Sequence, residues 1–207
     1  MKRIIALLLA LFLFATLTAC WPIKPSYSEK PVIYLYPETR TDVTVQLDYV
    51  GDLTCTYPAC DGTWRVTAAP DGTLTDDAGQ TYRYLYWEGM DDIQYDFSEG
   101  FCIPGDETAA FLEDALDRLG LTRAEANEFI IYWLPQMEGN AYNLISFQSD
   151  AYTDAAKLTI TPEPDTLLRV FMAWKPLPKP MELAPQTLAA PNRTGFTAVE
   201  WGGAMIH

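Results

Sequence analysis

The chain has 207 residues, of which 28 are acidic and 14 basic, and its formal net charge at pH 7 is −14. Because this charge repels the phosphates of nucleic acids, we expect no nucleic-acid partner. The single histidine, His207, is the last residue, where chains usually fray, which disfavours Ser-His-Asp and Cys-His hydrolases and histidine-containing zinc sites.

The N-terminus is typical of a bacterial lipoprotein signal. A basic start, an apolar run over 4–15 and the small-residue stretch Leu17-Thr18-Ala19 precede Cys20. This layout predicts that residues 1–19 are a signal peptide and that Cys20 is lipidated after cleavage, which anchors the protein at the extracytoplasmic face of the cell membrane. Two alternatives remain open: an ordinary signal peptide with a chance cysteine, and an uncleaved anchor, although the apolar run is shorter than the roughly 20 residues that span a bilayer.

Strand patterns dominate the rest of the chain. Residues 20–30 are proline-containing and predict a short extended tether, after which 31–37 form a strand between two prolines. Residues 42–50 alternate apolar and polar side chains, which is typical of an antiparallel strand with one solvated face. Similar patterns predict further strands at 63–69, 80–88, 143–148, 157–161, 166–174 and 195–201.

Helical patterns occur only in the middle of the chain. Asp106 is placed to cap a helix that ends at Gly120, and Thr122 with Glu125 forms a capping-box pattern at the start of a second helix. We expect 129–134, which are apolar on all sides, to form a buried strand that Pro135 ends, and 175–193 to form a proline-rich surface loop. The sequence thus predicts one α+β domain over 31–207, a mainly antiparallel, sandwich-like sheet with two short central helices.

The cysteines allow at most one internal disulfide if Cys20 carries a lipid. Cys55 and Cys60 flank a short turn and are the favoured pair, while a bridge from either of them to Cys102 and three free thiols remain alternatives. Cys102 on its own is typical of a small buried hydrophobic residue.

Four blocks along the chain resemble an uncharacterised family of bacterial exported, lipid-anchored proteins. The blocks are KPVIYLYP at 30–37, YLYWEG at 84–89, YWLP at 132–135 and VEWGG at 199–203. The resemblance covers nearly everything after the tether, but it implies no activity, because that family has no established ligand or catalytic residues. The Cys55 and Cys60 pair lies outside these blocks.

Two groups of carboxylates could carry chemistry. Glu88 and Glu200 each lie next to a tryptophan at a strand end, and glycoside hydrolases use two carboxylates about 5 to 10 Å apart beside aromatic platforms. The structural alternative is that each glutamate is paired with an arginine or a backbone amide. A second group gathers in one loop and could hold calcium, or could simply be solvated: Asp91, Asp92, Asp96 and Glu99.

A row of tyrosines is the last candidate site. Tyr82, Tyr84 and Tyr86 alternate along one predicted strand, so their rings share a face that Trp87 does not. Aromatic rows on a sheet bind sugars or protein partners, and with Trp201 these residues are the ligand-binding candidates; a sheet buried on both sides is the alternative.

The sequence therefore favours a binding or structural module over an enzyme. We expect a membrane-anchored lipoprotein that contacts an envelope glycan or an exported protein, without a cofactor. The alternative functions are a carboxylate-dependent glycan hydrolase that uses Glu88 and Glu200 and, more weakly, a calcium-stabilised scaffold.

Overall fold

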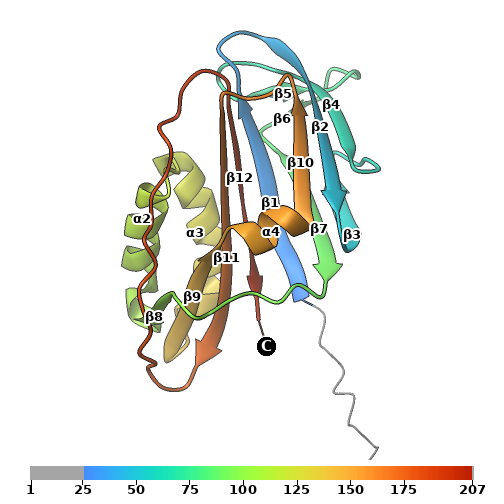
Figure 1. The fold of residues 1–207 in the computed structure, drawn as a ribbon. Coiled ribbons are helices and arrows are strands. Elements are labelled where there is room, and N and C mark those ends of the chain that lie inside the picture. The colour runs from blue at the N-terminus through green and yellow to red at the C-terminus, as the bar shows by residue number, and fades with distance from the viewer. Residues whose placement is uncertain (1–25, 207) are drawn as a thin grey trace, which may run out of the picture.

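The computed structural model describes residues 26–206. The predicted signal peptide, Cys20, the first residues of the predicted tether and His207 lie outside this range. The described chain forms three layers, in which two helices cover one face of a large sheet and a smaller sheet covers the other face (Figure 1). The predicted α+β fold, mainly antiparallel and sandwich-like, is confirmed.

The larger sheet has seven strands. Their spatial order is β3 (Asp52–Tyr57), β7 (Leu85–Asp91), β1 (Ser26–Tyr36), β12 (Thr197–Met205), β11 (Thr166–Leu177), β9 (Tyr142–Gln148) and β8 (Phe101–Pro104). The smaller sheet has the order β10 (Ala156–Thr161), β2 (Thr41–Tyr49), β4 (Thr63–Ala68), β5 (Leu74–Thr75) and β6 (Thr81–Tyr82). Among these strands only β11 and β12 pair in parallel.

Two apolar cores lie on the two faces of the larger sheet. The first core lies between the sheets and contains Val43, Val45 and Leu47, the inward residues of β2, together with Trp64 and Trp87. The second core lies between the larger sheet and the helices, and its fully buried strand residues come from β1, β9, β11 and β12. Strands β3 and β7 contribute none of these, so the helices leave that side of the sheet open.

The helical layer contains one clear correction. The short helix η1 (Gly105–Glu107) precedes α2 (Thr108–Arg118), and no side chain caps α2, so Asp106 is not its cap. The capping box of Thr122 and Glu125 is formed and opens α3 (Arg123–Met137). This helix contains 129–134, so the strand predicted there is wrong. Phe129, Trp133 and Met137 recur at helical spacing and are fully buried, whereas Ile131 between them is 64% exposed.

Several element boundaries also differ from those expected. Strand β1 begins at Ser26, so 26–30 belong to the sheet and not to a tether. The strand predicted at 80–88 is divided into β6 and β7, and β3, β5, β8 and α4 (Asp150–Ala155) were not predicted. None of the helices within 26–206 is both long and apolar enough to cross a membrane.

The cysteines in this range are all free thiols. The predicted bridge between Cys55 and Cys60 is not formed, because Cys55 is exposed on the edge strand β3 whereas Cys60 packs against the first core. The alternatives that involve Cys102 are not formed either, and three free thiols is the outcome.

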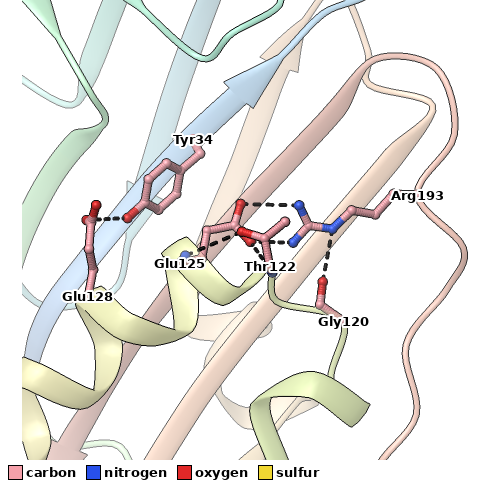
Figure 2. Close-up of polar contacts among 6 residues, drawn as sticks. All are labelled: Tyr34, Gly120, Thr122, Glu125, Glu128 and Arg193. Carbon is pink, nitrogen blue, oxygen red and sulfur yellow. Dashed lines mark hydrogen bonds and ion pairs between the residues drawn. The ribbon is translucent and has the colours of Figure 1, made fainter. Parts of the chain in front are cut away.

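The loop predicted at 175–193 begins only after β11 and returns the chain along the whole sheet to the start of β12 (Figure 1). A parallel pair requires such a crossover. Gln186 fixes the loop to β9 by bonding both the N–H and the carbonyl of Phe147. Arg193 donates to the Gly120 carbonyl and to both Glu125 oxygens, which joins the loop to the turn between α2 and α3 (Figure 2).

Candidate binding site

A pocket of about 490 Å³ opens beside β7, on the part of the sheet that the helices leave open. Its volume is within the roughly 300–1,000 Å³ typical of small-molecule sites. The lining combines aromatic rings with cationic side chains: Lys30, Tyr57, Thr81, Tyr82, Arg83, Tyr84 and Tyr86. It lies where the chain passes from β6 in the smaller sheet to β7 in the larger one, so both sheets contribute to one site.

The tyrosine rings are held in place by contacts with each other and with the core. Tyr57, which is 61% exposed, meets Tyr82 edge to face with ring centroids 5.5 Å apart. Tyr84 meets the buried ring of Tyr34 at 5.3 Å. Ring contacts thus support Tyr57, Tyr82 and Tyr84 in the absence of a ligand.

A single carboxylate organises the turn from which Tyr82 projects. The Tyr82 hydroxyl donates to Asp76 at 2.8 Å, and the backbone N–H groups of Ala78 and Gln80 donate to the same side chain. The N–H of Gln80 and the Tyr82 hydroxyl lower the pKa of Asp76 below its usual value. Asp76 thus stays ionised near neutral pH and orients this wall of the pocket.

Lys30 reaches the pocket because of an irregularity in β1. The strand bulges between Glu29 and Val32, and Lys30 has a φ of 59°, in the left-handed region that residues other than glycine seldom adopt. This backbone places the ammonium 5.2 Å from the ring centroids of both Tyr84 and Tyr86. Cation–π attraction stabilises the ammonium there, and no residue of 26–206 forms an ion pair with it.

Arg83 is the second cation of the pocket. Its side chain is 53% exposed, and its Nε lies 3.9 Å from one Glu128 oxygen. The other Glu128 oxygen accepts a 2.7 Å hydrogen bond from the Tyr34 hydroxyl, and Figure 2 shows this Tyr34–Glu128 contact. Within the described chain no hydrogen bond occupies the terminal nitrogens of Arg83. The guanidinium is thus loosely held and open to solvent.

The hydroxyls around Lys30 are proton donors at physiological pH. Burial, and then interaction with Glu88, raise the pKa of Tyr86. Burial and the charges of Glu29 and Glu88 raise the pKa of Tyr132, whose hydroxyl donates to Glu29 at 3.2 Å. These phenols remain neutral, and Tyr132 donates its proton to a hydrogen bond with Glu29.

The predicted row of three tyrosines does not share one face. Tyr84 and Tyr86 lie on the helix side of the sheet, whereas Tyr82 packs against the core between the sheets, because the strand is interrupted between Tyr82 and Leu85. All three nevertheless line the same pocket. Trp87 and Trp201 are fully buried in the two cores and are not exposed to a ligand.

The structure separates the two glutamates. Glu200 is fully buried and faces the core between the sheets, where Arg169 pairs with it at 2.7 Å and the Trp87 indole N–H donates to it at 3.2 Å. Glu88 follows Trp87 in the same strand and so lies on the opposite, helix-side face, where the Lys30 N–H approaches it at 3.4 Å. Two carboxylates on opposite faces of one sheet cannot flank one glycosidic bond.

The acidic loop is held by its own hydrogen bonds. Asp91 is buried and accepts from the hydroxyls of Ser28 and Tyr49 and from the N–H of Ile93. Asp96 accepts from Ser98, while Asp92 and Glu99 are exposed. Within residues 26–206, no three His, Cys, Asp or Glu side chains are gathered so that they could hold a metal.

Four pocket residues were not among the sequence-based candidates: Lys30, Tyr57, Thr81 and Arg83. Lys30 falls in the predicted tether and Tyr57 in an unpredicted strand, and both reach the pocket only through the pairing of β1 and β3 with β7. Arg83 lies between two candidate tyrosines in the sequence. A cationic residue within an aromatic run was the one feature that could have identified it as a site residue.

Comparisons with known proteins add a relative but no activity. No protein-family model matches the chain, and no solved structure does. Over 63 residues the chain is 56% identical to a protein described as "Uncharacterized protein in bglA 3'region" from Butyrivibrio fibrisolvens. The match covers 29% of this chain and 65% of that relative, slightly less than two thirds of its length.

Proposed function

We propose that this protein is an exported, lipid-anchored module that binds a glycan of the cell envelope in the tyrosine pocket. The observation that carries the proposal is the pocket itself, in which fixed tyrosine rings and two cationic side chains surround a hollow of about 490 Å³. Rigid aromatic planes cover the apolar faces of a sugar ring at little entropic cost, and neutral phenol and cationic groups hydrogen-bond its hydroxyls.

The proposed anchor is consistent with that ligand. Strand β1 begins six residues after Cys20, a stretch that reaches about 20 Å at most. A lipid on Cys20 would therefore hold the domain close to the membrane surface. The pocket would also lie near the membrane, because Lys30, which lines it, is only four residues after the start of β1. Glycans of the envelope lie within reach of a module held there.

Catalysis receives no support from the same geometry. The carboxylate pair that a hydrolase would need is divided between two faces of the sheet, and Glu200 is fully buried in an ion pair. We therefore propose binding without turnover.

The experiment is a glycan array probed with the purified full-length protein, followed by titration of the strongest ligand against variants. We expect Tyr57→Ala and Tyr82→Ala to weaken binding about five- to thirtyfold, because truncation of an aromatic anchor costs about 1–2 kcal/mol and about 1.4 kcal/mol corresponds to tenfold. The matched control is Tyr27→Ala, which removes another exposed tyrosine, 46% accessible, from outside the pocket. Absence of any glycan ligand, or a ligand to which both pocket variants bind normally, would refute the proposal.

A further inference from the structure

The charges of the pocket are opposite in sign to those of the protein. Acidic residues outnumber basic ones 28 to 14 in the whole chain, yet the charged residues that line the pocket are Lys30 and Arg83, with no carboxylate among them. A pocket that followed the composition would carry more acids than bases. Its lining instead favours an anionic group over a neutral one.

Arg83 has the geometry to bind such a group. Its contact with Glu128 uses only Nε, at 3.9 Å, and its side chain is 53% exposed. A guanidinium offers several N–H donors in a planar fork that matches a carboxylate or a phosphate in a bidentate arrangement. Because Glu128 also accepts the Tyr34 hydroxyl, that carboxylate is held by the core and does not follow Arg83 outward.

Lys30 supplies a second positive charge from the neighbouring wall. Its ammonium lies over Tyr84 and Tyr86 and has no ion-pair partner within the described chain. Ring contacts position a cation without neutralising it. The left-handed φ of Lys30 is a sparsely populated conformation of the kind that recurs at ligand sites, and it is what directs this side chain into the pocket.

Long-range repulsion does not prevent such a ligand from binding. The net charge of −14 acts on an anionic polymer from a distance, but at physiological ionic strength its field is screened over about 8 Å. At contact, the adjacent cations decide the interaction. Two nearby carboxylates already accept tyrosine hydroxyls, Glu29 from Tyr132 and Glu128 from Tyr34.

We propose that the pocket selects a sugar unit that carries an anionic group, a carboxylate or a phosphate, which Arg83 and Lys30 bind together while Tyr57 and Tyr82 pack against the sugar ring. This inference rests on the proposed function, since it specifies the glycan that the same pocket binds. The two sources of negative charge, acidic sugars and sugar- or polyol-phosphate polymers, share the chemistry that the cations recognise.

The test compares one charged polymer with its neutral ester and with a polymer that carries phosphate. Titration of the purified full-length protein with polygalacturonate, with the same polymer fully methyl-esterified, and with a glycerol-phosphate polymer separates carboxylate, neutral and phosphate ligands. We expect at least one anionic polymer to bind tenfold or more tightly than the esterified one. We expect Arg83→Gln and Lys30→Gln to reduce this ratio severalfold and Lys30→Arg to preserve most of it.

The matched control is Arg118→Gln, which removes an exposed arginine whose ion pair with Asp114 lies on α2, away from the pocket. Thermal melts of each variant establish that it is folded, and Arg83→Gln, at an exposed position, remains informative if Lys30→Gln does not fold. Equal binding of charged and neutral polymers, or binding of a neutral glycan with no binding of either anionic polymer, would overturn this inference and leave the proposed function standing. Failure of every glycan on the array would overturn both.

Discussion

Two arginines of this protein, Arg169 and Arg83, each lie next to a glutamate, but the first pair is buried and the second is largely exposed. The pair of Arg169 and Glu200 joins β11 to β12 at 2.7 Å, with side chains only 9% and 0% exposed. The pair of Arg83 and Glu128 is 3.9 Å long, with side chains 53% and 30% exposed. The first pair is enclosed by Trp87 and by Tyr152, whose ring lies 4.8 Å from the guanidinium.

This difference separates a structural role from a recognition role. A buried charge must keep its partner, because an unpaired charge in the interior costs several kcal/mol, whereas an exposed pair contributes little and can exchange its partner for a ligand. Burial raises the pKa of Tyr152 well above its usual range. Burial alone would lower the pKa of the Arg169 guanidinium, but its interactions with Glu200 and Tyr152 together outweigh burial and raise that pKa. Arg169 is thus charged at every physiological pH.

The largest expected effect is on Glu200. Glu200→Gln leaves Arg169 buried without a counter-charge, and we expect it to lower the free energy of unfolding by about 3–5 kcal/mol. Replacement of both partners by leucine should cost less than the single change, because no charge then remains buried. Urea unfolding of these variants measures both effects.

Glu88→Gln is the matched control, since Glu88 lies at the other face of the sheet, half-buried and with one long contact of 3.4 Å. We expect it to cost less than about 1 kcal/mol. If Glu200→Gln were as mild as Glu88→Gln, the interior pair would not have the structural role assigned to it.

A third pair, between Arg193 and Glu125, lies between these extremes, with side chains 23% and 1% exposed and a distance of 2.6 Å. Arg193→Ala should cost about 2 kcal/mol at pH 7, because charge-assisted hydrogen bonds contribute about 1.5–3 kcal/mol each and only some are replaced by water. Burial alone would raise the pKa of Glu125, but Arg193 and the Thr122 N–H outweigh it and lower that pKa below its ordinary 4.5.

The sign of the pH dependence follows from that depressed pKa. As the pH falls below about 4.5, the unfolded chain takes up a proton at Glu125 before the folded protein does, so the stabilisation is present above this pH and is lost below it. Unfolding free energies at pH 7 and pH 3 should show the gap between wild type and Arg193→Ala narrowing in acid. Arg123→Ala, which removes an exposed pair with Glu113, is the control and should show little gap at either pH. A gap that stayed constant would mean that Arg193 acts through packing alone.

Local sequence patterns were sufficient to predict an element where one of its faces is buried and the other is solvated. The alternation in β2 and the capping box of α3 are local patterns, and both are confirmed. The strand predicted at 129–134 was wrong because β-branched and aromatic residues are typical of strands. Here they form a helix whose buried stripe packs on the larger sheet. Propensity is a weak prior that tertiary packing overrides.

The candidate site was predictable only in part, because some of its residues are brought together by strand pairing between distant segments. Tyr82, Tyr84 and Tyr86 are neighbours in sequence, so their common location could be predicted from spacing. Lys30 and Tyr57 join them through strand pairing between distant segments, which no local pattern encodes. The separation of Glu88 from Glu200 likewise depends on which face each strand presents, and that depends on sheet order and register.

The smallest expected effect is the loss of Arg83 from the folded protein. Arg83→Gln removes one exposed contact of 3.9 Å and leaves the hydrogen bond between Tyr34 and Glu128 in place. We expect the free energy of unfolding to change by less than about 0.5 kcal/mol, as for exposed pairs in general. The control Arg118→Gln, which also removes an exposed pair, should change it equally little. Urea unfolding at low and high salt checks this, since a weak surface pair is screened further by salt. A loss of 1 kcal/mol or more would place Arg83 with Arg169 among the structural residues, and the comparison that assigns it to ligand recognition would fail.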